Sequence, residues 1–139
     1  MDRHRDDFKN LIENSIDILF ANEAELLSLY ESDDFETALA QLSAANVVAC
    51  VTRSEKGSVI LDGEDHYIID TMPVEKVIDT TGAGDQYAAG VLAARVLGLD
   101  WADAGRLGSV CAAEVISHYG ARPESDLKTF ATQAGILPE

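Results

Sequence analysis

The residues best suited to chemistry in this 139-residue chain lie between positions 79 and 90, in the run Asp-Thr-Thr-Gly-Ala-Gly-Asp-Gln-Tyr-Ala-Ala-Gly. Gly82 and Gly84 lack a Cβ, so the backbone can take a positive φ and a phosphate can approach its amides. A helix that begins here leaves its first N–H groups without partners and carries the positive end of its dipole, which attracts anions. Asp85, in or near the first turn, is placed to accept the proton of an attacking hydroxyl.

The same run also has a purely structural interpretation. Thr80 or Thr81 can cap the helix, the glycines can form a turn, and Asp85 can simply favour the helix dipole. Spacing alone favours this interpretation, because short glycine-rich turns from strand to helix are common. The rest of the chain must therefore decide between a cap and a phosphate site.

Apolar strands alternate with helical patterns along the chain, which predicts an α/β fold with a largely parallel sheet. The predicted strands are 16–21, 47–52, 76–78 and a hairpin of 57–61 with 66–69 around Asp62-Gly63. The predicted helices are 3–13, 23–30, 35–44 with Ser32 or Asp33 as its cap, 82–97 with Gly98 after it, one that begins at Asp100, and a last one to about Ala134. No repeat or linker divides the chain, so residues 1–139 are predicted to form a single domain.

Composition restricts the partners. Ten Lys and Arg residues against 25 Asp and Glu residues leave a net charge of -15, so we expect no binding to nucleic acid or to anionic membranes. No apolar leader or stretch of membrane-spanning length is present, which favours a cytoplasmic location. Cys50 and Cys111 have neither metal-ligand nor disulfide spacing and are predicted to be buried core residues.

The run from 79 to 90 resembles the C-terminal signature of the PfkB/ribokinase family of carbohydrate and nucleoside kinases. In that family the Gly-Ala-Gly-Asp amides form an anion hole for the transferred phosphate, and the aspartate is the catalytic base. The resemblance implies an anion hole of Gly82, Ala83, Gly84 and the amide of Asp85, with Asp85 as the base. It also implies that Asp79 and Thr81 help to bind a monovalent cation such as K⁺.

Two upstream elements resemble further parts of the same family. Asn22-x-x-Glu25 is similar to an Asn-x-x-Glu element near the nucleotide phosphates and Mg²⁺, a hard cation that prefers oxygen ligands. From the residues alone, Asn22 is a helix cap and Glu25 a solvated helix residue. The run 51–57 resembles a Val-Thr-x-Gly-x-x-Gly loop beside the ATP site, which implies nucleotide contacts from Thr52, Ser54 and Gly57. Ser54 stands where glycine is usual, so the path of this loop is left open.

Other candidates are assigned to structure. His4, His66 and His118 have no common spacing for a metal and are expected on the surface or in turns. Residues 109–121 occupy the place where the family lines its adenine pocket, although helix core is the expectation for Cys111 and Ala112. The acidic group at 33–36 is expected to be a solvated helix start.

The resemblance implies an ATP-dependent kinase for a sugar or nucleoside hydroxyl, nearest to adenosine-kinase-like sugar kinases, with ATP, Mg²⁺ and K⁺ as cofactors. It implies a ribokinase-like three-layer fold that is incomplete, because only the C-terminal, ATP-side half of the family is matched. The exposed edge of such a sheet predicts either a homo-oligomer or a missing N-terminal half that covers it. The alternative is a truncated, non-catalytic nucleotide-binding or assembly module that needs another chain for the acceptor site.

Overall fold

The computed structural model describes residues 4–74, 76–124, 126–133 and 135–137 of the chain. Contacts group the chain into two compact units, Met1–Ser54 with Ser58–Ile68, and Glu55–Gly57 with Ile69–Glu139. Each unit has its own helices, and the single domain expected from the sequence stays a prediction. In the described part of the chain, no helix has both the length and the apolar character needed to span a bilayer.

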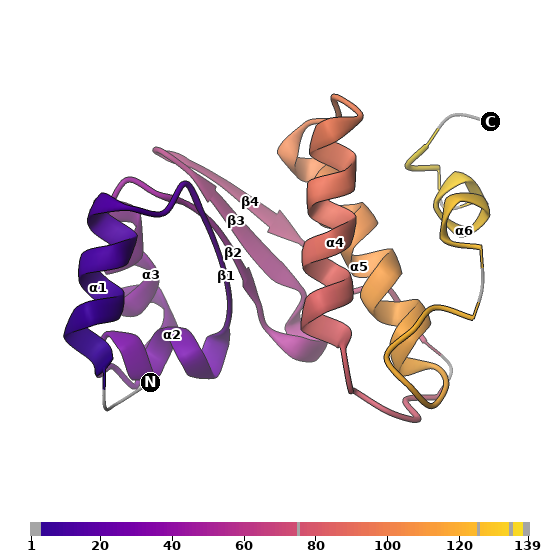
Figure 1. Ribbon diagram of the computed structural model, residues 1–139, viewed down its shortest axis with the longest axis horizontal. Coiled ribbons are helices and arrows are strands. Elements are labelled where there is room, and N and C mark those ends of the chain that lie inside the picture. Colours follow the sequence, from indigo (N-terminus) through magenta and orange to yellow (C-terminus); the bar gives the residue numbers. More distant parts are fainter. Residues whose placement is uncertain (1–3, 75, 125, 134, 138–139) are drawn as a thin grey trace. The chain divides into compact units, whose positions relative to one another are not determined.

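The sheet has four strands in the order β1-β2-β3-β4 (Figure 1). Its strands are β1 (Ile18–Asn22), β2 (Val48–Thr52), β3 (Ser58–Asp62) and β4 (Asp65–Ile69). β1 and β2 are parallel, whereas β2 and β3 are antiparallel. The prediction of a largely parallel sheet is therefore wrong. A short connection after β2 takes the place of a crossover helix, and short connections join antiparallel strands.

Three helices build the core of this first unit with the sheet: α1 (Arg5–Asn14), α2 (Glu23–Leu29) and α3 (Phe35–Ala44). Alternate residues of β2 and β3 point to one face and pack in a single cluster with the buried side chains of the helices. The members of this cluster include Leu26, Leu29, Phe35, Leu42, Ala49, Val51, Val59 and Leu61. Asp34 caps α3 through the N–H of Thr37 at 3.0 Å, one residue later than expected, because the Ser32 hydroxyl accepts the N–H of Asp34.

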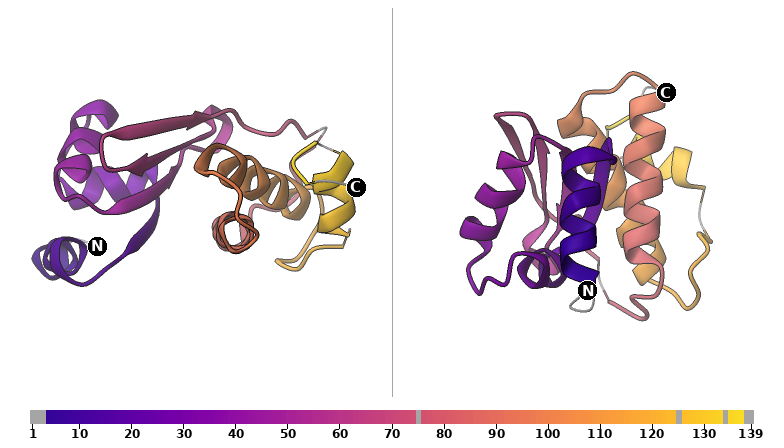
Figure 2. Two further views of the ribbon diagram at one scale, coloured as in Figure 1. Left: turned by 90° about the horizontal axis from the view of Figure 1, so that it is seen from above. Right: turned by 60° about the vertical axis from the view of Figure 1, so that its left-hand side comes forward.

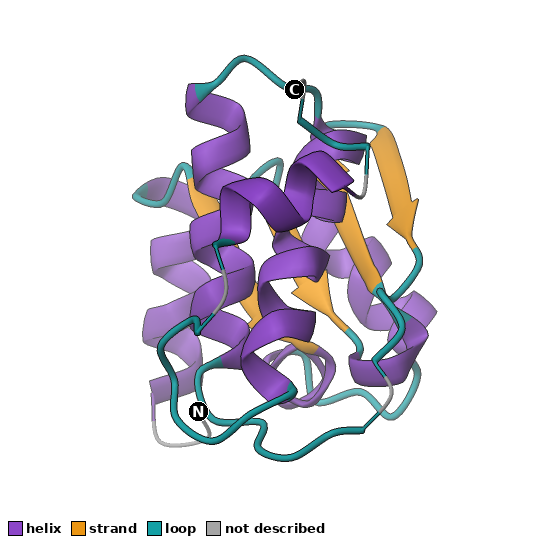
Figure 3. Ribbon diagram, turned by 90° about the vertical axis from the view of Figure 1, so that its right-hand side faces the viewer, coloured by secondary structure: helices purple, strands orange, loops and turns teal. Residues whose placement is uncertain are grey.

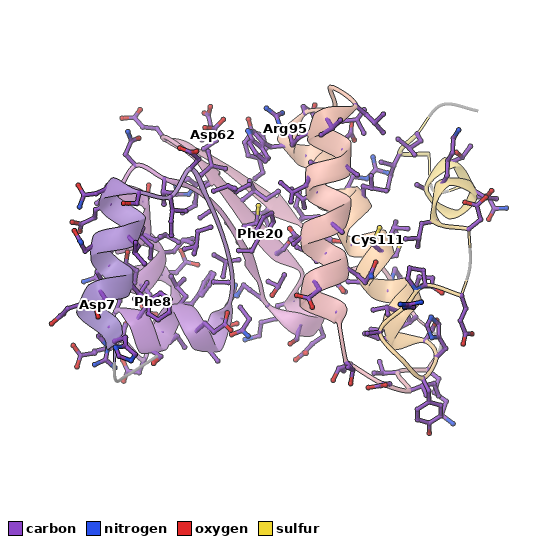
Figure 4. All side chains as sticks on the ribbon, viewed as in Figure 1. Asp7, Phe8, Phe20, Asp62, Arg95 and Cys111 are labelled. Carbon is purple, nitrogen blue, oxygen red and sulfur yellow. The ribbon has the colours of Figure 1, made fainter. Side chains whose placement is uncertain are left out.

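The second unit contains α4 (Ala83–Val96), α5 (Trp101–Ile116) and α6 (Leu127–Gln133), drawn in Figures 2 and 3. α4 and α5 meet at two glycines: a Cβ at Gly90 would lie 2.8 Å from the Cα of Gly108. Arg95 lies on α4 (Figure 4). Its guanidinium lies over the Trp101 ring, 4.0 Å from the ring centroid. This pair of helices positions the candidate site, because α4 begins at the glycine-rich run.

Two sequence-based expectations about smaller features have opposite outcomes. Both cysteines are buried, and burial raises the pKa of Cys50 to about 12 and that of Cys111 to about 11, as expected for inert core thiols.

The strand expected at 76–78 does not form. Instead, the N–H groups of Ile78 and Asp79 both donate to the carbonyl of Ile116, at 2.8 and 3.3 Å. A carbonyl at the end of α5 thus accepts the hydrogen bonds that the carbonyls of a neighbouring strand would have accepted.

Candidate active site

The N-terminus of α4 is formed by a left-handed glycine. Gly82 has φ 82° and ψ 2°, and no side chain caps the helix. The cap by Thr80 or Thr81 that a purely structural interpretation required is therefore not made. The Thr80 carbonyl accepts instead from Ala83, whose N–H lies 3.2 Å away.

Two amides of the first turn are open to ligands. Among the residues that the structure describes, no acceptor is found for the N–H groups of Gly84 and Asp85. Both residues are exposed, and a Cβ built on Gly84 would meet nothing within 4 Å. Free amides of exposed residues at the positive end of a helix are suited to hold an anion. Asp85 is the third residue of the same helix, so its carboxylate lies beside this turn.

Asp79 ties the loop before α4 to the loop after α5. Its Oδ1 accepts the N–H of Thr81 at 2.9 Å, and its Oδ2 accepts the N–H of Gly120 at 3.1 Å. These hydrogen bonds, above all those with Thr81, hold the pKa of Asp79 below its ordinary value. The carboxylate therefore keeps its negative charge, which favours a cation beside it.

The loop after α5 also explains why position 82 is glycine. A Cβ at Gly82 would lie 2.7 Å from the Cβ of Ala121. The carbonyl of Ala121 accepts from the side chain of Gln86 at 3.3 Å. Glycine is thus required at position 82 because φ is positive there and because Ala121 leaves no room for a Cβ.

In the first unit, Asn22 and Glu25 cap α2 reciprocally. Asn22 Oδ1 accepts the N–H of Glu25 at 2.8 Å, and Glu25 Oε2 accepts the N–H of Asn22 at 2.9 Å. The sequence-based interpretation of Asn22 as a cap is confirmed, and Glu25 completes a capping box. Both residues are exposed, so the second oxygen of Glu25 can still meet a hydrated cation.

Thr52 and Ser54 lie at the end of β2 in this unit. Thr52 pairs with Asn22 in the parallel register, so the two residues stand at the same end of the sheet. Ser54 has φ 52°, the left-handed conformation that glycine adopts without strain. Arg53, between them, donates from Nε to Glu23 Oε2 at 3.1 Å and lies 3.7 Å from the centroid of the Phe35 ring. These two contacts of Arg53, which hold the loop after β2 to α2 and α3, were not predicted from the sequence.

The backbone of Ser54 leads to a stability prediction. Ser54→Gly is expected to raise the free energy of unfolding by about 0.5–1 kcal/mol, because removing the left-handed strain outweighs the added entropy of glycine in the unfolded chain. Urea denaturation measures the change. Ser15→Gly is the matched control, since Ser15 is exposed with φ −136° and its replacement should lower stability. A loss of stability in Ser54→Gly would contradict the strain.

Gly57 belongs to the second unit, and its backbone conformation explains why glycine stands at this position. Its φ is 90°, and a Cβ there would lie 2.0 Å from the carbonyl oxygen of Ile69. The site residues expected from the sequence therefore fall into two groups. The first unit holds Asn22, Glu25, Thr52 and Ser54, and the second holds Gly57, Asp79, Thr81, Gly82, Ala83, Gly84 and Asp85.

A buried acid and a histidine near the site escaped the sequence reasoning. His118 Nε2 lies 2.8 Å from Glu114 Oε1, and the two side chains are only 12% and 3% exposed. His118 lies in the bend after α5, as expected of a turn residue, but its side chain is largely buried against Glu114, and this pairing was not predicted. The spacing of four residues on a helix was the signal that could have identified the pair.

The titration of His118 is a second prediction. A hydrogen bond to the carbonyl of Tyr119, followed by the interactions with Glu114 and Glu124, raises the pKa of His118. Its contribution to stability is therefore fully present below the pKa of an unfolded histidine and lost as the pH rises through the folded value. NMR titration of the His118 ring should give a midpoint above that of free histidine. A midpoint at or below that of free histidine would refute this environment.

The chain thus combines an α/β sheet unit with a later helix whose N-terminus is formed by a left-handed glycine and has amides unpaired among the described residues, as in proteins that bind phosphate groups. The model of the pfkB family carbohydrate kinases matches residues 2–128, so the chain belongs to this family.

Solved structures agree with this assignment. A protein described as a probable sugar kinase from Rhizobium etli CFN 42 superposes with a TM-score of 0.95 at 44% identity, over 98% of this chain and 42% of that one. An adenosine kinase from Sinorhizobium meliloti superposes with a TM-score of 0.91 at 42% identity, over 95% and 41%. A protein described as a ribokinase II from E. coli, solved with ATP and Mg²⁺, has a TM-score of 0.82 at 27% identity, over 96% and 43%. The chain also spans less than half the length of the curated relatives that it matches first.

Proposed function

We propose that this chain is the ATP-side part of a kinase that phosphorylates a hydroxyl of a sugar or nucleoside. The observation that carries the proposal is the N-terminus of α4, where the amides of two exposed residues, Gly84 and Asp85, have no acceptor in the described part of the chain and lie beside a carboxylate. Membership in a family of carbohydrate kinases supports it, and so does the ATP and Mg²⁺ held by a structurally similar protein. The fold proposed for the complete kinase is the ribokinase-like three-layer fold, to which this chain contributes its part.

In this proposal the 82–85 turn holds the transferred phosphate, chiefly through the amides of Gly84 and Asp85, because the N–H of Ala83 already donates to Thr80. Asp85 accepts the proton of the attacking hydroxyl. ATP would supply its γ-phosphoryl group and leave as ADP, and bound Mg²⁺ would supply positive charge to neutralise the phosphates. Glu25 would hold a hydrated Mg²⁺ with the carboxylate oxygen that does not cap α2, and Asn22 would lie beside the phosphates. Thr52, Ser54 and Gly57 border the nucleotide, while Asp79 and Thr81 bind a monovalent cation such as K⁺.

The length of the chain bears on the acceptor site. The chain spans less than half of its relatives, and the sugar or nucleoside is proposed to bind residues outside the sequence described here, in a missing N-terminal half or in another copy of the chain. The same observation favours a second candidate function, a nucleotide-binding or assembly module that does not transfer phosphate alone. Both functions require ATP binding, and only the kinase requires turnover.

Phosphotransfer from ATP distinguishes the two functions. The chain is incubated with ATP and Mg²⁺ and with ribose, fructose or adenosine, alone and together with the N-terminal half of the R. etli relative. The kinase proposal expects a phosphorylated acceptor in at least one mixture. ATP binding by calorimetry without product in any mixture would support the module instead. Absence of both binding and product would overturn the proposed function.

A further inference from the structure

The segment from Ser117 to Ala121 supports the candidate phosphate site although it belongs to no helix or strand. The N–H of Gly120 holds Asp79, and the carbonyl of Ala121 holds the side chain of Gln86. Ala121 also stands against Gly82, where it leaves no room for a Cβ. The path of this irregular segment therefore determines where the first turn of α4 can lie.

Glu114, in the last turn of α5, holds this segment through its carboxylate. Its Oε1 lies 2.8 Å from His118 Nε2 and accepts the N–H of Glu124 at 3.0 Å. One buried oxygen thus contacts the segment at His118 and the chain beyond it at Glu124. The Glu114 side chain is 3% exposed, so water competes little for these contacts.

The ring of His118 is engaged on both sides. Its Nε2 faces the Glu114 carboxylate, and its Nδ1 lies 3.0 Å from the carbonyl oxygen of Tyr119. Both neighbours are acceptors, so both ring nitrogens can donate only when the imidazole is protonated. Glu124 Oε1 lies 3.7 Å from Nδ1 and adds a second negative charge. The ring therefore joins α5 to the backbone of the segment with a fixed orientation.

A buried ion pair is weak evidence for a contribution to stability, because desolvation offsets the attraction. The contacts that the pair makes with the segment after α5 say more about its role than its net stability does. We propose that Glu114 and His118 are positioning residues of the phosphate site: they fix the segment 117–121, and this segment fixes Asp79 and the Gly82 turn. The inference rests on the proposed function only for the identity of the ligand, because the chain of contacts from Glu114 to Asp79 exists without it.

Amide hydrogen exchange tests the chain of contacts directly. The N–H groups of Thr81 and Gly120 both donate to Asp79, so their exchange rates report whether the segment is in place. In His118→Ala we expect exchange at both amides to become at least tenfold faster, relative to amides in the middle of α4 and α5. His118→Gln keeps a donor for Glu114 and should restore part of the protection. His66→Ala, an exposed histidine on β4, is the matched control and should change neither amide.

Equal acceleration of Thr81, Gly120 and the helix amides would overturn the proposal, because it would indicate a general loss of stability. Should His118→Ala fail to fold, His118→Gln decides instead: faster exchange at Thr81 and Gly120 with unchanged helix amides supports the proposal, and exchange at both amides equal to that of the unaltered chain contradicts it. ATP titration provides the link to the site. The dissociation constant should rise at least tenfold in His118→Ala and recover partly in His118→Gln. If the unaltered chain does not bind ATP, the proposed function fails, while the exchange rates still decide the positioning role.

Discussion

Asp85→Asn is expected to lower kcat for phosphotransfer by roughly 10²–10⁴, the usual contribution of a general base. Asparagine has nearly the same shape as aspartate but cannot accept the proton of the acceptor hydroxyl. Asp85 is exposed, so the substitution should leave the fold intact. Affinity for ATP should be unchanged or higher, because a negative charge beside the phosphate is removed. Initial rates with the most active acceptor mixture, and calorimetry with ATP, measure the two effects.

Asp103→Asn is the matched control for this substitution. Asp103 is the third residue of α5, as Asp85 is the third residue of α4, but its Oδ1 pairs with Arg106 at 3.2 Å. It should lower kcat by less than about twofold, since an exposed pair of this kind contributes little. Equal losses in the two variants, or full activity in Asp85→Asn, would contradict the role of Asp85 as the base.

Gly82→Ala is expected to lower the free energy of unfolding by about 3 kcal/mol, the sum of left-handed strain and overpacking. The new Cβ would lie 2.7 Å from the Cβ of Ala121 at φ 82°, and movement of either loop disturbs the site. ATP binding should be lost together with stability. Thermal or urea unfolding and calorimetry give the two quantities.

Gly84→Ala separates the phosphate site from the fold. Apart from its chain neighbours and the nearby backbone of its own helix, no described residue lies within 4 Å of the position of the new Cβ, so stability should be kept or rise by up to about 1 kcal/mol through helix propensity. The methyl group nevertheless stands where a phosphate would approach the amides, and the affinity for ATP should fall at least tenfold. A Gly84→Ala chain that binds ATP as tightly as the unaltered one would contradict the placement of the phosphate.

Local signals in the sequence predicted local structure well. The Asp62-Gly63 pair predicted the hairpin, and Gly63 takes φ 62° there. Gly98, with φ 83°, follows α4 as expected, and Asp100 caps α5 through the N–H of Asp103. Each of these features depends on a few adjacent residues, whose preferred backbone angles or cap chemistry are visible in the sequence.

Features that depend on distant parts of the chain were predicted less well. The residues 76–78 have the composition of a strand, but their hydrogen bonds go to Ile116 near the end of α5. The burial of Glu114 with His118 depends on how the segment after α5 folds back. For the candidate site, the sequence placed the glycines and Asp85 correctly at the start of a helix. It did not indicate that Gly120 and Ala121, which lack reactive side chains, hold this start in position.

The amide resonances of Gly84 and Asp85 provide the most direct test of the central claim, that the start of α4 holds the phosphate of ATP. A ¹⁵N-labelled chain is titrated with ATP and Mg²⁺ and, separately, with adenosine. The account predicts progressive, saturable shifts of both resonances with ATP and none with adenosine, since the N–H groups meet the phosphate. ATP-dependent shifts confined to other residues, or no shifts at all, would contradict it.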